Sequence, residues 1–130
     1  MRYLSPPLAI GALRRGKEIE QFLGGFDHGE QHIIRWATLG PGEDRVTLYL
    51  GEVVDVGTDS FLDVSEFPPL DPDEESWGKI IGAVADPNEA LALAEHHLGA
   101  SQDRWVNQGV IGSEYQDYRA ARSHGSSPNP

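Results

Sequence analysis

The chain has 130 residues, with 10 basic and 21 acidic side chains and no cysteine. Its formal charge of −11 makes nucleic acids and anionic membrane surfaces unfavourable partners, because both attract proteins mainly through lysine and arginine. The absence of cysteine excludes a disulfide scaffold, a thiolate zinc site and a cysteine nucleophile. A chain of this length corresponds to one domain.

The two ends of the chain indicate a cytoplasmic protein with a single folded domain. The N-terminal segment is mildly apolar, but two prolines interrupt it and three basic residues follow, which is not the order of a secretory signal. No stretch approaches the roughly 18–20 apolar residues that span a bilayer. We therefore expect one cytoplasmic domain over 1–122. Residues 123–130 are small or polar, and we expect a disordered tail there.

Alternating and β-branched apolar residues predict a series of strands that follow one another as a meander. The segment 17–23 fits both helical and strand spacing, and the strands after it favour a strand. The glycine- and proline-bearing segment 40–44 is typical of a hairpin loop between two strands. The predicted strands cover residues 17–23, 31–39, 45–56, 61–67 and 79–85.

The longest of these strands contains a charged residue on its apolar side. Val46, Leu48 and Leu50 alternate cleanly and point to one face, and Glu52 would follow them onto that face. A bulge at Gly51, where one extra residue shifts the register, would remove the conflict. The sequence therefore predicts a bulge in this strand.

Capping residues predict a helix over 87–98. Asp86 is suited to accept the first N–H groups, Pro87 to occupy the first helical position, and Gly99 to form a left-handed C-terminal cap. A second helix is expected over 114–122. Strands followed by helices are typical of the α+β class, so we expect an antiparallel meander of four to five strands with two C-terminal helices packed on one face. The other face would then be solvated or would meet a partner.

The acidic residues gather in one quarter of the chain. From residue 43 to residue 75 there are eleven acids and one base, with large apolar residues between the acids. Such a surface either keeps the protein soluble or docks a cationic partner, whose approach it would accelerate. A purely solubilising run does not need aromatic residues, which interfaces use as anchors. The residues expected to contact a basic protein are Asp59, Asp63, Glu66, Phe67, Leu70, Asp71, Asp73, Glu74, Glu75 and Trp77.

In its general character the chain resembles small acidic immunity proteins, which bind and neutralise one basic toxin domain. The resemblance lies in size, negative charge, lack of cysteine and the order of strands before helices. It implies a non-catalytic inhibitor whose partner is a basic protein and which needs no cofactor.

Two other functions stay open at this stage. The mixture of polar and apolar residues at Trp105, Asn107 and Gln108 predicts either a buried loop or a ligand pocket, in which His32 would serve as an acid–base group of a small enzyme. Alternatively, the uncovered sheet face would meet a second copy of the chain in a self-assembling structural subunit.

The recognisable metal and nucleotide motifs do not fit this chain. His28 and His32 are four residues apart on a predicted strand, roughly 13 Å, which is too far for one metal ion. The acidic run at 71–82 lacks the glycine and the final glutamate of a calcium loop, since Ser76 and Gly82 occupy those positions. Motifs for a serine nucleophile, a phosphate loop and a dinucleotide are missing. We therefore expect neither a metal nor a cofactor.

Overall fold

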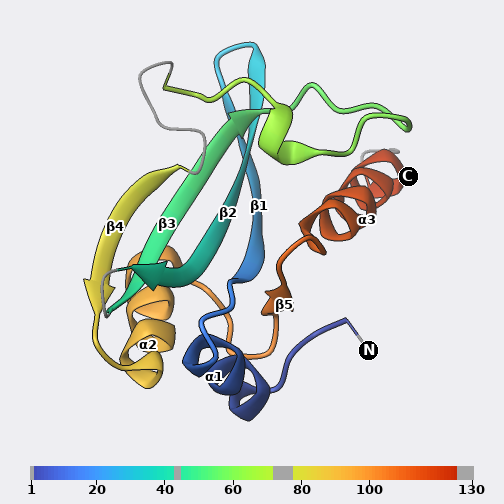
Figure 1. Ribbon diagram of the computed structural model, residues 1–130. Coiled ribbons are helices and arrows are strands. Elements are labelled where there is room, and N and C mark those ends of the chain that lie inside the picture. The colour runs from blue at the N-terminus through green and yellow to red at the C-terminus, as the bar shows by residue number, and fades with distance from the viewer. Residues whose placement is uncertain (1, 43–44, 72–77, 126–130) are drawn as a thin grey trace.

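Five antiparallel strands and three helices make up the fold in the computed structural model, which describes residues 2–42, 45–71 and 78–125 (Figure 1). The strands follow the order β4–β3–β2–β1–β5 across one sheet, and α2 and α3 come after most of the strands, so the predicted α+β class is confirmed. The elements are α1 (Pro6–Arg14), β1 (Ile19–His28), β2 (Gln31–Gly42), β3 (Arg45–Val54), a 3₁₀ helix (Val64–Glu66), β4 (Lys79–Val84), α2 (Pro87–Leu98), β5 (Val106–Asn107) and α3 (Ile111–Gly125).

Most of the predicted strands are confirmed, with two corrections. The ambiguous segment 17–23 enters β1, and β2, β3 and β4 stand where alternation predicts them. The hairpin loop predicted over 40–44 is wrong at its start, because β2 continues and pairs Gly42 with Arg45; residues 43–44 lie outside the described ranges. The strand predicted over 61–67 is also wrong. That segment holds the 3₁₀ helix, which Asp63 caps by accepting the N–H of Ser65.

Glu52 stays in register, so the bulge predicted at Gly51 is wrong. Arg35 pairs with Glu52 and Trp36 with Gly51 without a shift between β2 and β3. The charge on the apolar face is instead met across the strands, since Arg35 Nε lies 3.3 Å from Glu52 Oε2. The glycine has another use, because a Cβ at Gly51 would lie 2.6 Å from the Trp36 ring.

The first helix, α1, is not predicted by the sequence patterns. Its two prolines occupy the first helical turn, where no N–H partner is needed, and so start the helix rather than interrupt the chain. Its buried residues, Ala9, Ala12 and Leu13, pack against α2 and the sheet. The helix α2 follows its prediction at both ends: Asp86 accepts the N–H of Asn88 at 3.0 Å, and Gly99 adopts a φ of 71°.

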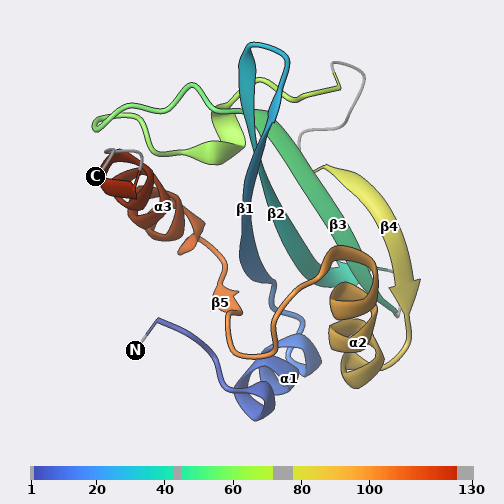
Figure 2. The same ribbon diagram turned by 180° about the vertical axis from the view of Figure 1, so that it is seen from behind.

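Each face of the sheet carries its own apolar cluster. Ala37 and Leu39 belong to a cluster with α1, α2 and Trp105, whereas Trp36 belongs to a second cluster with Tyr115 of α3. Because neighbouring residues of a strand point to opposite faces, α2 and α3 pack on opposite sides of the sheet, rather than together on one face as the sequence predicts. Figure 2 shows α2 in front of the ends of β3 and β4, with α3 away on the far side of β1.

The last helix runs further than expected. It includes the predicted helix over 114–122 and extends to Gly125, three residues into the segment expected to be a disordered tail; residues 126–130 lie outside the described ranges. None of the helices in the described parts of the chain has the length and apolar composition that crossing a membrane requires.

Candidate functional site

The long segment between β3 and β4, which we call the acidic loop (residues 55–71), is attached to α3 at its start. Asp55, whose side chain is only 11 % exposed, accepts the hydroxyl of Tyr115 and the N–H of Gly57, and lies 3.8 Å from Arg122. A Cβ at Gly57 would overlap the Tyr115 phenol, so only glycine allows this approach. The start of the acidic loop is therefore fixed by one buried carboxylate and one glycine.

The aromatic residues of the acidic loop divide between core and surface. Phe67 is 3 % exposed, with its ring 5.4 Å from that of Tyr115, so its predicted place in a partner-binding surface is wrong in this structure. The reason is α3, whose Tyr115 covers it. Phe61 packs edge-on against Phe67 at 5.0 Å and is 37 % exposed, and Val56 is 42 % exposed. The exposed apolar residues of this loop are thus Val56 and Phe61.

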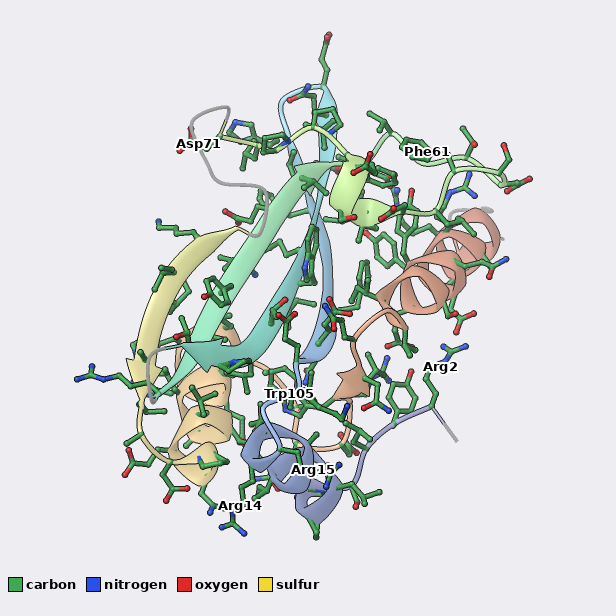
Figure 3. The ribbon with its side chains drawn as sticks, in the orientation of Figure 1. Arg2, Arg14, Arg15, Phe61, Asp71 and Trp105 are labelled. Carbon is green, nitrogen blue, oxygen red and sulfur yellow. The ribbon has the colours of Figure 1, made fainter. Side chains whose placement is uncertain are left out.

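Three predicted acids stand around these residues at the surface. Asp59 is fully exposed and pairs with Arg119 at 2.8 Å. Asp63 is exposed and bonds to Ser65, and Glu66 is exposed. Figure 3 shows Phe61 on the part of the loop that lies above α3. Since Phe61 and these acids are exposed, the loop presents apolar and acidic groups together.

The remaining predicted anchor that the structure describes, Leu70, lies at the edge of the sheet. Leu70 donates its N–H to Glu52 of β3, and β4 joins the same edge of β3 with Lys79 opposite Leu50. Leu70 is half-buried and Asp71 is exposed, whereas the other predicted contact residues of this segment lie outside the described ranges. Those residues are Asp73, Glu74, Glu75 and Trp77.

The ligand pocket predicted near Trp105 is not assembled as expected. Trp105 is fully buried in the cluster shared with α1 and α2. Asn107 pairs with Ile19 at the beginning of β1, whereas His32 pairs with Asp27 near the other end of that strand. This separation amounts to roughly 26 Å along the strand, so His32 cannot act on a ligand at Asn107. Gln108 donates to Glu18 at 3.1 Å, and both line a shallow hollow near Pro41.

His32 takes part in a contact that the sequence does not predict. Its Nδ1 lies 2.8 Å from Asp27 Oδ1, and its Nε2 lies 2.5 Å from the hydroxyl of Tyr118 in α3. Burial raises the pKa of the Tyr118 phenol, while nearby Arg122 lowers it in part. A protonated phenol donates to His32, so this chain of three groups joins α3 to the β1–β2 hairpin.

A second unpredicted cluster surrounds the buried carboxylate of Glu114. The side chain is 4 % exposed, and its Oε2 accepts Arg2 at 2.7 Å and the Tyr3 hydroxyl at 2.8 Å. The hydrogen bond to Glu114 raises the pKa of Tyr3, and that of Arg2 is raised first by its bond to Asp117 and then by Glu114. These groups come from opposite ends of the chain, so no local pattern could have joined them.

Glu114 and Asp117 also line a hollow of about 550 Å³ between β1, the end of α2 and α3. Its wall combines polar residues with apolar and aromatic ones. The lining residues include Tyr3, Phe22, Leu23, Leu98, Arg104 and Glu114.

Among residues 2–42, 45–71 and 78–125, no group of three or more His, Asp or Glu side chains is placed to hold a metal ion. In comparisons with protein-family models, with curated proteins and with solved structures, the chain shows no match.

Proposed function

We propose that the protein is a non-catalytic binding module that docks a basic protein on the acidic loop. The observation that carries the proposal is the exposure of Phe61 among the carboxylates of Asp59, Asp63 and Glu66. An apolar anchor with a charged rim is the composition of a protein interface, and the carboxylates would pair with lysine or arginine of the partner. An inhibitor or immunity-type protein against a basic enzyme is the most concrete form of this function.

The support behind the acidic loop favours binding without a large loss of conformational entropy. Val64 and Phe67 of the acidic loop are buried, and Asp55 joins its first residues to Tyr115. A loop that is ordered before the partner arrives does not have to be ordered on binding, which leaves more of the contact free energy for affinity.

The charges along the molecule favour one orientation of a cationic partner. Figure 3 shows Asp71 and Phe61 towards one end, and Arg14 at the end of α1 and Arg15 just after it at the opposite end. Both arginines are exposed. A basic partner would be attracted to the acidic loop and repelled from α1, so that encounters begin at the proposed surface.

The test is affinity capture from the cells of origin, followed by titration of each purified captured protein against two matched variants. Phe61→Ser with Glu66→Lys changes the proposed surface, and Leu8→Ser with Asp103→Lys makes the same chemical change elsewhere. Leu8 is exposed on α1 and Asp103 is exposed before β5. We expect the first variant to bind a basic protein at least about tenfold more weakly, and the second to bind it like the parent.

Salt gives an independent reading of the same experiment, because screening weakens exposed charge pairs. The proposal would be contradicted if both variants lost affinity equally, or if neither the substitutions nor added salt changed the affinity. Thermal unfolding of each variant shows whether the fold has survived the substitutions.

A further inference from the structure

The hollow beside Glu114 contains charged groups whose hydrogen-bonding capacity is not used up. Glu114 Oε2 is occupied by Arg2 and Tyr3, whereas Oε1 lies 3.8 Å from Arg104. That distance is longer than a hydrogen bond. Within the described residues no hydrogen bond to Oε1 is found, and this oxygen is not one of the fully enclosed, unpartnered atoms, so it is open to the hollow that Glu114 lines.

Arg104 supplies the complementary group at the rim of the hollow. Its side chain is 54 % exposed, and its guanidinium lies over the Tyr3 ring, 4.9 Å from the ring centre. In the described part of the chain this guanidinium donates no hydrogen bond. A ring contact leaves its N–H groups available, so Arg104 is able to turn towards an anionic group without breaking a hydrogen bond.

The balance of charge restricts what the hollow would bind. Arg2 and Arg104 face two carboxylates, Glu114 and Asp117, so the cluster is close to neutral. A ligand with a net charge would upset this balance, whereas a zwitterion would preserve it. An ammonium group would bond to Glu114 Oε1 and an adjacent carboxylate to Arg104, which gives four groups of alternating charge.

The rest of the wall and the size of the hollow fit a small ligand with an apolar part. Phe22, Leu23 and Leu98 line it beside the charged groups. Its volume of about 550 Å³ lies within the range of about 300–1,000 Å³ that is usual for small-molecule sites. We propose that this hollow binds a free α-amino acid with an apolar side chain, through Glu114 and Arg104. The inference does not rest on the proposed function, because the hollow and the acidic loop share none of the residues that carry either argument.

The experiment is calorimetric titration of the full chain with L-leucine, together with two analogues that each lack one charge. Leucinamide keeps the ammonium group without the carboxylate, and 4-methylpentanoate keeps the carboxylate without the ammonium group. We expect leucine to bind with a Kd in the millimolar range or below, and each analogue to bind at least about tenfold more weakly.

Two variants assign the binding to these groups. Arg104→Gln, on an exposed side chain, is expected to keep the fold and to weaken leucine binding at least about tenfold. Arg14→Gln, on the exposed end of α1, is expected to leave it unchanged. The proposal is overturned if leucine at millimolar concentration gives neither a heat of binding nor shifts of backbone amide signals in NMR spectra. It is also overturned if either analogue binds as well as leucine, or if Arg104→Gln binds leucine like the parent. Glu114→Gln tests the group expected to bind the ammonium, and it should also weaken leucine binding. Its unfolding is measured as well, because this carboxylate also holds Arg2 and Tyr3.

Discussion

Gly57 and Tyr115 approach so closely that no side chain larger than hydrogen fits between them. A Cβ built on Gly57 would overlap the Tyr115 hydroxyl, and that hydroxyl is held in place by Asp55. The contact joins the start of the acidic loop to α3, two segments far apart in the sequence. It fixes the position of the proposed binding surface relative to the rest of the fold.

The substitution Gly57→Ala is therefore expected to separate the loop from α3. The added methyl group would force Tyr115 or the loop backbone to move, at a cost of about 1–3 kcal/mol in the free energy of unfolding. Urea unfolding followed by circular dichroism measures this loss. Gly112→Ala is the matched control, because a Cβ there would lie 3.5 Å from Leu62 O, an ordinary contact, and alanine favours a helix. Equal stability of the two variants would show that the close contact is not needed.

Tyr115→Phe is expected to change how stability depends on pH. Burial first, and then the bond to Asp55, raise the pKa of the Tyr115 phenol. Above about pH 10 the unfolded chain loses this proton while the folded chain keeps it, so the free energy of unfolding falls as pH rises. The variant should lose about 1–2 kcal/mol at neutral pH, with the missing hydrogen bond, and should show a shallower decline between about pH 9 and pH 11.

The control for this experiment is Tyr49→Phe, in the middle of β3, where Tyr49 pairs with Ile80 of β4. If the free energy of unfolding falls equally for the parent and Tyr115→Phe as pH rises through the alkaline range, this position does not hold a buried, protonated phenol.

Arg35 and Glu52 provide a test of the cross-strand pair that replaces the predicted bulge. Both side chains are partly buried, at 29 % and 25 % exposure, and screening by water is reduced there. A double-mutant cycle to alanine is expected to give a coupling free energy of about 1 kcal/mol. The same cycle on Arg119 and Asp59, whose carboxylate is fully exposed, should give less than about 0.5 kcal/mol. Equal couplings would show that burial does not strengthen the pair.

Local patterns in the sequence were enough to place most strands and the helix α2. Alternation marks β3 and β4, because one side of each strand packs on α2 and the other does not. Asp86 and Gly99 mark the ends of α2, because each satisfies backbone groups within one turn of itself. The helix α1 could not be predicted, because its prolines indicate either the start of a helix or a break in one. Only the packing of Ala9 and Ala12 in the core decides between the two.

The candidate sites were less predictable, because their partners lie far away in the chain. A phenylalanine such as Phe67 is equally suited to a binding surface and to a core, and here its burial depends on the contact with Tyr115 of α3. His32 meets Tyr118, and Glu114 meets Arg2, across more than eighty residues. Asp59, Asp63 and Glu66 lie at the surface, because carboxylates without buried partners stay in water, and their contact with a partner stays a prediction.

Glu20→Gln is expected to stabilise the protein at neutral pH. Burial raises the pKa of this carboxyl, with a smaller contribution from Glu18, although the N–H of Gly109 at 3.0 Å partly opposes the shift. The folded state therefore holds this proton more tightly than the unfolded state, so ionisation at neutral pH costs stability and acid relieves it. Glutamine keeps an acceptor for Gly109 without the charge, so the variant should gain up to about 1 kcal/mol at pH 7 and nothing near about pH 4. Glu89→Gln, in the first turn of α2, should instead lose a few tenths of a kcal/mol at about pH 7, because a negative charge there favours the helix. Urea unfolding of parent and both variants at the two pH values decides the matter, and a Glu20→Gln variant less stable than its parent at neutral pH would contradict the expected cost of this buried charge.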